Sequence, residues 1–141
     1  MKKSPFFYLF TLVFFVACGG EGQEGWATED MMVEPSPYAA GEKIYVSHCA
    51  SCHQKTGEGL EGAFPPLAQS DYLMADKERA IQIIAHGMDG LIVVNGVEYD
   101  AIMTSQGLTN EEVKDVMNYI LNSWGNDGGE VTREEVNKVL N

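Results

Sequence analysis

Three residues in the first half of the chain have types and a spacing that can hold a cofactor. Cys49 and Cys52 are three positions apart and His53 follows directly, which makes the pattern C-x-x-C-H. This pattern is the attachment signature of c-type haem. Two cysteines three apart on a helical turn can each reach one vinyl group of the macrocycle, and the next residue then places an imidazole under the iron. The thioether bonds hold the ligand in place, so His53 does not have to compete for iron by affinity alone.

Other chemistries of a C-x-x-C pair need features that this sequence does not offer. A thioredoxin-like redox pair needs a βαβ context, and a zinc site needs a second C-x-x-C or H-x-H pair. A simple disulfide between Cys49 and Cys52 leaves His53 without a role. We therefore expect one haem c, bound covalently through Cys49 and Cys52, with His53 as a ligand of its iron.

The residues around the motif resemble class I, mono-haem cytochromes c, and the resemblance covers most of the segment from Tyr38 to Trp124. Gly41 and Tyr45 match positions at which that family has a glycine and an aromatic residue packed against the C-terminal helix. The glycine there lets the two backbones approach closely. The resemblance implies an all-α fold, with about four helices around one covalently bound haem.

A proline pair, Pro65 and Pro66, precedes Leu67 at the distance after the histidine where the family has Pro-x-Leu. In the family the proline carbonyl accepts a hydrogen bond from the imidazole Nδ1–H, which fixes the tautomer and orients the ring for iron. By that spacing the resemblance assigns this role to Pro65, with Pro66 as the alternative. A proline pair that only stiffens the loop also stays open.

The sixth iron ligand has to come from the opposite side of the haem, and the chain has seven methionines. Three lie in the N-terminal segments, Met117 lies in a helical apolar stripe, and Met74 follows too soon after the proline loop. Met88 and Met103 remain. In the family the axial methionine occupies the loop before the last helix, so the resemblance assigns Met103. Thr104 follows it where the family has proline, which predicts a less rigid loop.

His86 is the main competitor for the sixth position, and bis-histidine ligation would give a much lower potential. Its place at a predicted helix C-terminus, before Gly87, favours a surface histidine that interacts with the helix dipole.

With His53 and Met103 both bound, the iron has no open position, and one-electron transfer is the remaining task. We therefore expect no catalytic residue and no small-molecule substrate. A haem gas sensor with a labile sixth ligand is an alternative.

Local patterns predict the elements that position these residues. A helix is expected over residues 76–86, and another begins at the capping box Thr109–Glu112 and runs to Trp124. Between them, Asn95-Gly96 separates two β-branched runs, which predicts a small β-hairpin within residues 91–99.

The chain is expected to hold one domain with extensions. We expect the cytochrome-like domain over residues 37–125. Residues 126–141 contain a second capping box, Thr132–Glu135, and predict a short amphipathic helix. We expect this helix to pack back on the domain, and docking of a partner is the alternative.

Residues 1–17 are typical of an export signal. Lys2 and Lys3 precede the apolar run Phe6–Ala17, which as a helix would span roughly 18 Å against about 30 Å for a bilayer core. The run ends in Phe15-Val16-Ala17-Cys18, which resembles the lipobox of bacterial lipoproteins. That resemblance implies cleavage before Cys18, lipidation of its thiol and a periplasmic, membrane-anchored protein. A plain signal peptide with an incidental cysteine and a retained short anchor are the alternatives.

The charge of the chain limits its partners. It has 21 acidic and 9 basic residues, a net charge of -12, and no basic stripe that could neutralise nucleic-acid phosphates. Residues 18–36 are acidic and predict a solvated tether. The acidic surface predicts redox protein partners with basic docking patches, contacted in a salt-dependent way. A dedicated cytochrome subunit of a respiratory complex, such as a nitrite reductase or a terminal oxidase, is the alternative to a free carrier.

Overall fold

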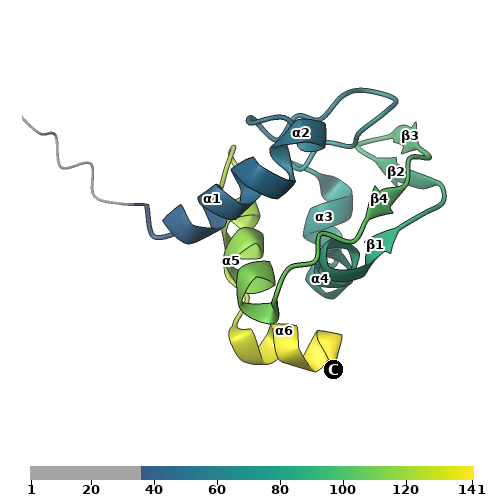
Figure 1. The fold of residues 1–141 in the computed structure, drawn as a ribbon. Coiled ribbons are helices and arrows are strands. Elements are labelled where there is room, and N and C mark those ends of the chain that lie inside the picture. Colours follow the sequence, from purple (N-terminus) through teal and green to yellow (C-terminus); the bar gives the residue numbers. More distant parts are fainter. Residues whose placement is uncertain (1–35) are drawn as a thin grey trace, which may run out of the picture. The chain divides into compact units, whose positions relative to one another are not determined.

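The computed structural model describes residues 36–141, and Figure 1 shows how their elements are arranged. The predicted signal peptide, Cys18 and the tether up to residue 35 lie outside the described residues. Four helices have eight or more residues: α1 (Ala39–His48), α4 (Lys77–His86), α5 (Asn110–Leu121) and α6 (Arg133–Leu140). Two are short: α2 (Ala50–His53) and α3 (Asp71–Ala75). Within residues 36–141, no helix has the length and apolar character needed to cross a membrane.

Helices α1 and α5 cross at a glycine. A Cβ on Gly41 would lie 2.0 Å from the carbonyl oxygen of Asp115 and 2.7 Å from the Cβ of Tyr119, so only a residue without a side chain allows this approach. One turn further on, Tyr45 is fully buried, and its ring centroid lies 5.4 Å from that of Tyr119 and 4.8 Å from that of Trp124. Aromatic pairs attract each other at such distances. The predicted packing of Gly41 and Tyr45 against the helix that follows the capping box Thr109–Glu112, which is α5, is confirmed.

Helix α4 begins at the predicted place, because the Asp76 carboxylate accepts a hydrogen bond from the Arg79 N–H at 2.9 Å. Helix α3, just before it, was not predicted. Its N-cap is Ser70, whose Oγ accepts a hydrogen bond from the Leu73 N–H at 3.2 Å. Asp76 has an extended backbone between the two helices, which ends α3 after little more than one turn.

A β-hairpin stands between α4 and α5. Strands β2 (Ile92–Val94) and β3 (Val97–Tyr99) pair antiparallel across Asn95 and Gly96, whose φ angles are 50° and 81°. Positive φ at both positions is what a type I′ turn requires, and the predicted hairpin is confirmed. Asp71 of α3 holds the turn: its carboxylate accepts a hydrogen bond from the Asn95 N–H at 2.7 Å, and its own N–H donates to Asn95 Oδ1 at 3.0 Å.

A second antiparallel pair was not predicted. In strands β1 (Gly87–Met88) and β4 (Met103–Thr104), Gly87 lies opposite Thr104 and Met88 lies opposite Met103. Gly87 is the residue at which α4 ends. A Cβ on Gly87 would lie 2.3 Å from the carbonyl oxygen of Met103, so the absence of a side chain allows β4 to lie beside it. The pair ties the end of α4 to the segment in which we predicted the sixth ligand.

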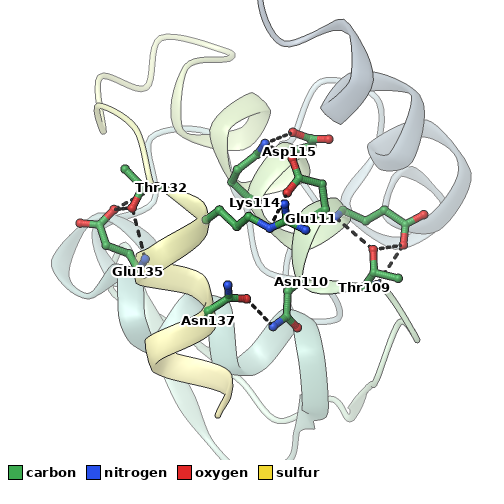
Figure 2. Close-up of polar contacts among 10 residues, drawn as sticks. Thr109, Asn110, Glu111, Lys114, Asp115, Thr132, Glu135 and Asn137 are labelled. Atoms are coloured by element: carbon green, nitrogen blue, oxygen red, sulfur yellow. Dashed lines mark hydrogen bonds and ion pairs between the residues drawn. The ribbon is translucent and has the colours of Figure 1, made fainter.

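Both predicted capping boxes are present, at Thr109–Glu112 and Thr132–Glu135, and Figure 2 shows their hydrogen bonds at the starts of α5 and α6. Helix α5 ends at Leu121, three residues earlier than predicted. Trp124 has a φ of 53°, a left-handed backbone that no α-helix accommodates.

Helix α6 packs against α4 and α5. Val131 and Val136 belong to the buried core, so the expectation that this helix folds back on the domain is confirmed. Asn118 of α5 holds the preceding segment, because its Oδ1 accepts from the Val131 N–H at 2.7 Å and its Nδ2 donates to the Val131 carbonyl at 3.0 Å. At the polar edge of the contact, Asn110 Nδ2 donates to Asn137 Oδ1 at 2.8 Å (Figure 2).

Candidate functional site

The C-x-x-C-H motif forms a helical turn at the end of α1. The Cys49 N–H donates to the Tyr45 carbonyl at 2.9 Å, and the His53 N–H donates to the Cys49 carbonyl at 2.9 Å, which closes the single turn of α2. Cys49 and Cys52 form no disulfide with each other; Cys49 is buried and Cys52 is partly exposed. Burial, with a smaller effect of Cys52, raises the pKa of the Cys49 thiol to about 11. A nucleophilic thiol has a lowered pKa, so the Cys49 thiol is not activated in that way.

The His53 ring is buried, with 8% of its surface exposed, and one of its nitrogens is already engaged. Nδ1 lies 2.9 Å from the carbonyl oxygen of Pro65. A carbonyl only accepts hydrogen bonds, so Nδ1 carries the proton and Nε2 has a free lone pair. Burial lowers the pKa of His53 and the bond to Pro65 partly opposes this. The result is an oriented imidazole with Nε2 available to a metal, and its contact is the carbonyl of Pro65 rather than that of Pro66.

The loop between the histidine and the proline is held near both ends. The hydroxyl of Tyr45 donates to the Gln54 carbonyl at 2.6 Å, and Gln54 has a φ of 62°, which turns the chain out of α2. At the other end, the Leu60 N–H donates to the Phe64 carbonyl at 2.8 Å and the Phe64 N–H donates back at 2.7 Å. These bonds bring the next carbonyl, that of Pro65, under the imidazole.

The histidine borders two adjoining cavities. Neither cavity has an Asp or Glu side chain in its lining among the described residues. The two cavities share six lining residues: Cys49, His53, Pro65, Met88, Ile92 and Met103. The shared residues therefore place a cysteine, an imidazole and two thioether side chains around a largely apolar space.

Both candidate methionines reach this space. Met88 and Met103 are partly buried, lie opposite each other in the β1–β4 pair and line both cavities. His86 is exposed and is not among the lining residues of either cavity. His48 is exposed and lines the second cavity. The structure therefore brings Met103 to the same space as His53 and leaves His86 outside it.

Three residues with polar side chains also line the first cavity, and the sequence pattern did not predict them. Ser70, Tyr72 and Arg79 line it. Arg79 Nη2 donates a hydrogen bond to the Tyr72 carbonyl, and the guanidinium carbon lies 3.7 Å from the Tyr72 ring centroid. Arg79 Nε is buried and has no hydrogen-bond partner among the described residues. A mostly apolar space bordered by a free imidazole nitrogen and two thioether side chains fits a haem, which is a large apolar ring.

Taken together, these features define a haem-binding protein of the c type, in which two cysteines and the following histidine border a largely apolar space. The family model for cytochrome c matches residues 38–124. Cytochrome c-552 of Thermus thermophilus is 40% identical over 112 residues, covering 72% of this chain and 84% of that protein. The chain belongs to the cytochrome c family, as a class I mono-haem member. It is an electron-transfer protein rather than an enzyme, and it carries haem c bound covalently through Cys49 and Cys52.

Similar segments also occur within larger proteins. The cytochrome c subunit of alcohol dehydrogenase (quinone) from Gluconacetobacter polyoxogenes is 34% identical over 104 residues, which cover 70% of this chain and 22% of that subunit. The cbb3-type cytochrome c oxidase subunit CcoP of Rubrivivax gelatinosus is 29% identical over 107 residues, which cover 75% of this chain and 32% of that subunit. This kind of domain therefore occurs both as a small cytochrome and within subunits of oxidoreductase complexes.

Proposed function

We propose that this chain is a one-electron carrier whose haem iron is bound by His53 on one side and by Met103 on the other. The observation that carries the proposal is the oriented His53 ring, with Nδ1 on the Pro65 carbonyl, bordering the same cavities as the Met103 side chain. The haem supplies the reversible one-electron change. His53 and Met103 would hold the iron, and the thioether, a soft and neutral donor, would favour the reduced state. The Pro65 carbonyl keeps the imidazole in the tautomer that leaves Nε2 free.

The ligand assignment is tested by two matched substitutions, Met103→Ala and Met88→Ala. Both remove a partly buried thioether from the same strand pair and the same cavities, so a general effect of cavity enlargement is common to both. Purified holoprotein would be compared by its reduction potential and by its visible spectrum, reduced, with and without carbon monoxide.

We expect Met103→Ala to bind carbon monoxide and to have a lower potential, and Met88→Ala to behave like the wild type. Carbon monoxide binding by Met88→Ala alone would move the sixth ligand to Met88. Ready binding of carbon monoxide by the wild type would refute a closed iron and favour a gas-binding role instead.

We propose further that export removes residues 1–17 and that a lipid on Cys18 anchors the domain on the periplasmic side of a bacterial membrane. The sequence pattern of the N-terminus supports this, with Lys2, Lys3 and the apolar run Phe6–Ala17 before a lipobox-like end. In a Cys18→Ser variant, the red protein should leave the membrane fraction, and the wild type should show the added mass of acyl chains. A wild type without that mass would contradict lipidation.

A free carrier is the first choice for the cellular role, and a dedicated subunit of an oxidoreductase complex is the second. The second is favoured by the relatives that are cytochrome subunits of a dehydrogenase and an oxidase. Mild extraction and purification of a tagged chain would separate them, since a subunit brings a larger enzyme with it in fixed ratio. Because the chain has a net charge of -12, electron transfer to a partner with a basic docking patch should slow as salt is raised.

A further inference from the structure

The side chain of Asn126 joins the end of α5 to the loop that follows the proline pair. Its Nδ2 donates to the Leu67 carbonyl at 3.0 Å and to the Ile120 carbonyl at 2.7 Å. Its Oδ1 accepts a hydrogen bond from the Gln69 N–H at 2.6 Å. One amide therefore binds three backbone groups, and two of them belong to a segment that is distant in the sequence.

The backbone is turned on both sides of this contact. Trp124 and Gly125 have φ angles of 53° and 84°, and these turns bring Asn126 back to the end of α5. Gln69 has a φ of 50°, and a non-glycine residue keeps such a conformation only where its surroundings hold it. The bond from its own N–H to Asn126 is such a restraint. Asn126 lies beyond residue 124, where the match to the family model ends.

The loop that Asn126 binds also carries the acceptor of the His53 ring. Leu67 is held from its other side too, because its N–H donates to the Gly57 carbonyl at 2.7 Å. Pro66 has a fixed φ and restricts the preceding residue, Pro65, to extended backbone. Two stiff residues cannot absorb a shift of Leu67. Such a shift would therefore reach the Pro65 carbonyl, which lies 2.9 Å from His53 Nδ1.

We propose that Asn126 is a positioning residue for the iron ligand: it holds Leu67 so that the Pro65 carbonyl stays on His53 Nδ1. The inference rests on the proposed ligation of iron by His53. A hydrogen bond at Nδ1 makes the imidazole a stronger donor at Nε2, and a stronger donor favours the oxidised iron. Loss of the Asn126 contacts should therefore weaken the bond at Nδ1 and raise the reduction potential.

The test compares Asn126→Ala with Asn118→Ala in purified holoprotein. Asn118 is also partly buried, and its amide also binds backbone groups, but these belong to Val131, before α6, and not to the proline loop. A general loss of stability is thus common to both variants. The first measurement is the exchange of the His53 Nδ1 proton with solvent, followed by NMR in the reduced protein. The second is the reduction potential.

We expect the ring proton to exchange about tenfold faster in Asn126→Ala than in Asn118→Ala, the factor that corresponds to one hydrogen bond. The potential should rise in Asn126→Ala and stay at the wild-type value in Asn118→Ala. Equal exchange rates and equal potentials in the two variants would overturn the proposal.

A second variant, Asn126→Asp, keeps an acceptor for the Gln69 N–H but cannot donate to the Leu67 carbonyl. It should also show the faster exchange, and it serves as the test if Asn126→Ala does not retain haem. Exchange as slow as in the wild type would then overturn the proposal. His53→Ala tests the ligation separately, because an unchanged visible spectrum in that variant would refute His53 as the iron ligand. If that spectrum changes and the two asparagine-to-alanine variants still coincide, only the role of Asn126 is refuted.

Discussion

Replacing Gly41 with alanine tests the contact between α1 and α5. The new Cβ would start 2.0 Å from the Asp115 carbonyl oxygen, whereas heavy atoms meet favourably near about 3.5 Å. A backbone oxygen inside a helix does not move alone, so the two helices have to separate. Overpacking of this kind costs about 3 kcal/mol, the upper end of the usual range. Alanine gains about 1 kcal/mol over glycine in helix propensity. The variant should therefore be less stable by about 2 kcal/mol.

For a domain of this size that loss lowers the Tm by about 10 °C. The assay is thermal unfolding of the holoprotein followed by far-ultraviolet circular dichroism. Ala40→Gly is the control, because Ala40 is the exposed neighbour on α1 and its replacement should cost no more than about 1 kcal/mol of helix propensity. A Gly41→Ala protein as stable as the wild type, or more stable, would refute the close crossing.

Three further predictions concern the cofactor and the C-terminal helix. Replacing Cys49 and Cys52 together by alanine should abolish covalent haem and reduce the helical circular dichroism, because the small core is built around the cofactor. Asn118→Ala should lower the free energy of unfolding in urea by about 2 kcal/mol, since it leaves both backbone groups of Val131 without partners. The Thr132 N–H and hydroxyl lower the pKa of Glu135 from its ordinary value of 4.5. The ionised carboxylate of the capping box therefore stabilises the folded protein fully at pH values above the ordinary pKa of Glu135. This contribution is lost as the pH falls through the lower pKa that Glu135 has in the folded protein. Glu135→Gln should therefore reduce the loss of stability in acid titrations.

The elements that were predicted correctly have short-range causes. A capping box depends on residues three apart, and the turn at Asn95 and Gly96 depends on the two residues that tolerate positive φ. The C-x-x-C-H motif is equally local, because its spacing alone sets the turn that presents both thiols and the imidazole. Gly41 could be predicted through the family resemblance, which supplied the partner helix that the local sequence does not reveal.

The features that were missed depend on distant contacts. Strands β1 and β4 have two residues each, too few to show an alternating pattern, and Gly87 looks like a helix-terminating glycine until the Met103 carbonyl is placed beside it. Arg79 looks like an ordinary surface cation in the first turn of a helix. Its contact with the Tyr72 ring appears only when α3 is placed beside α4.

The segment that carries Met103 is restrained by strand pairing where the family uses proline. Thr104 in that position predicts a less rigid loop, but β4 pairs with β1, which continues directly from α4. Ser105 adds a second link, because its Oγ donates to the Ala85 carbonyl near the end of α4 at 2.5 Å. A thioether tied in this way moves with the end of α4. In the arrangement that we propose, α4 would then help to position the sixth ligand, so a shift of α4 should change the ligation of the iron.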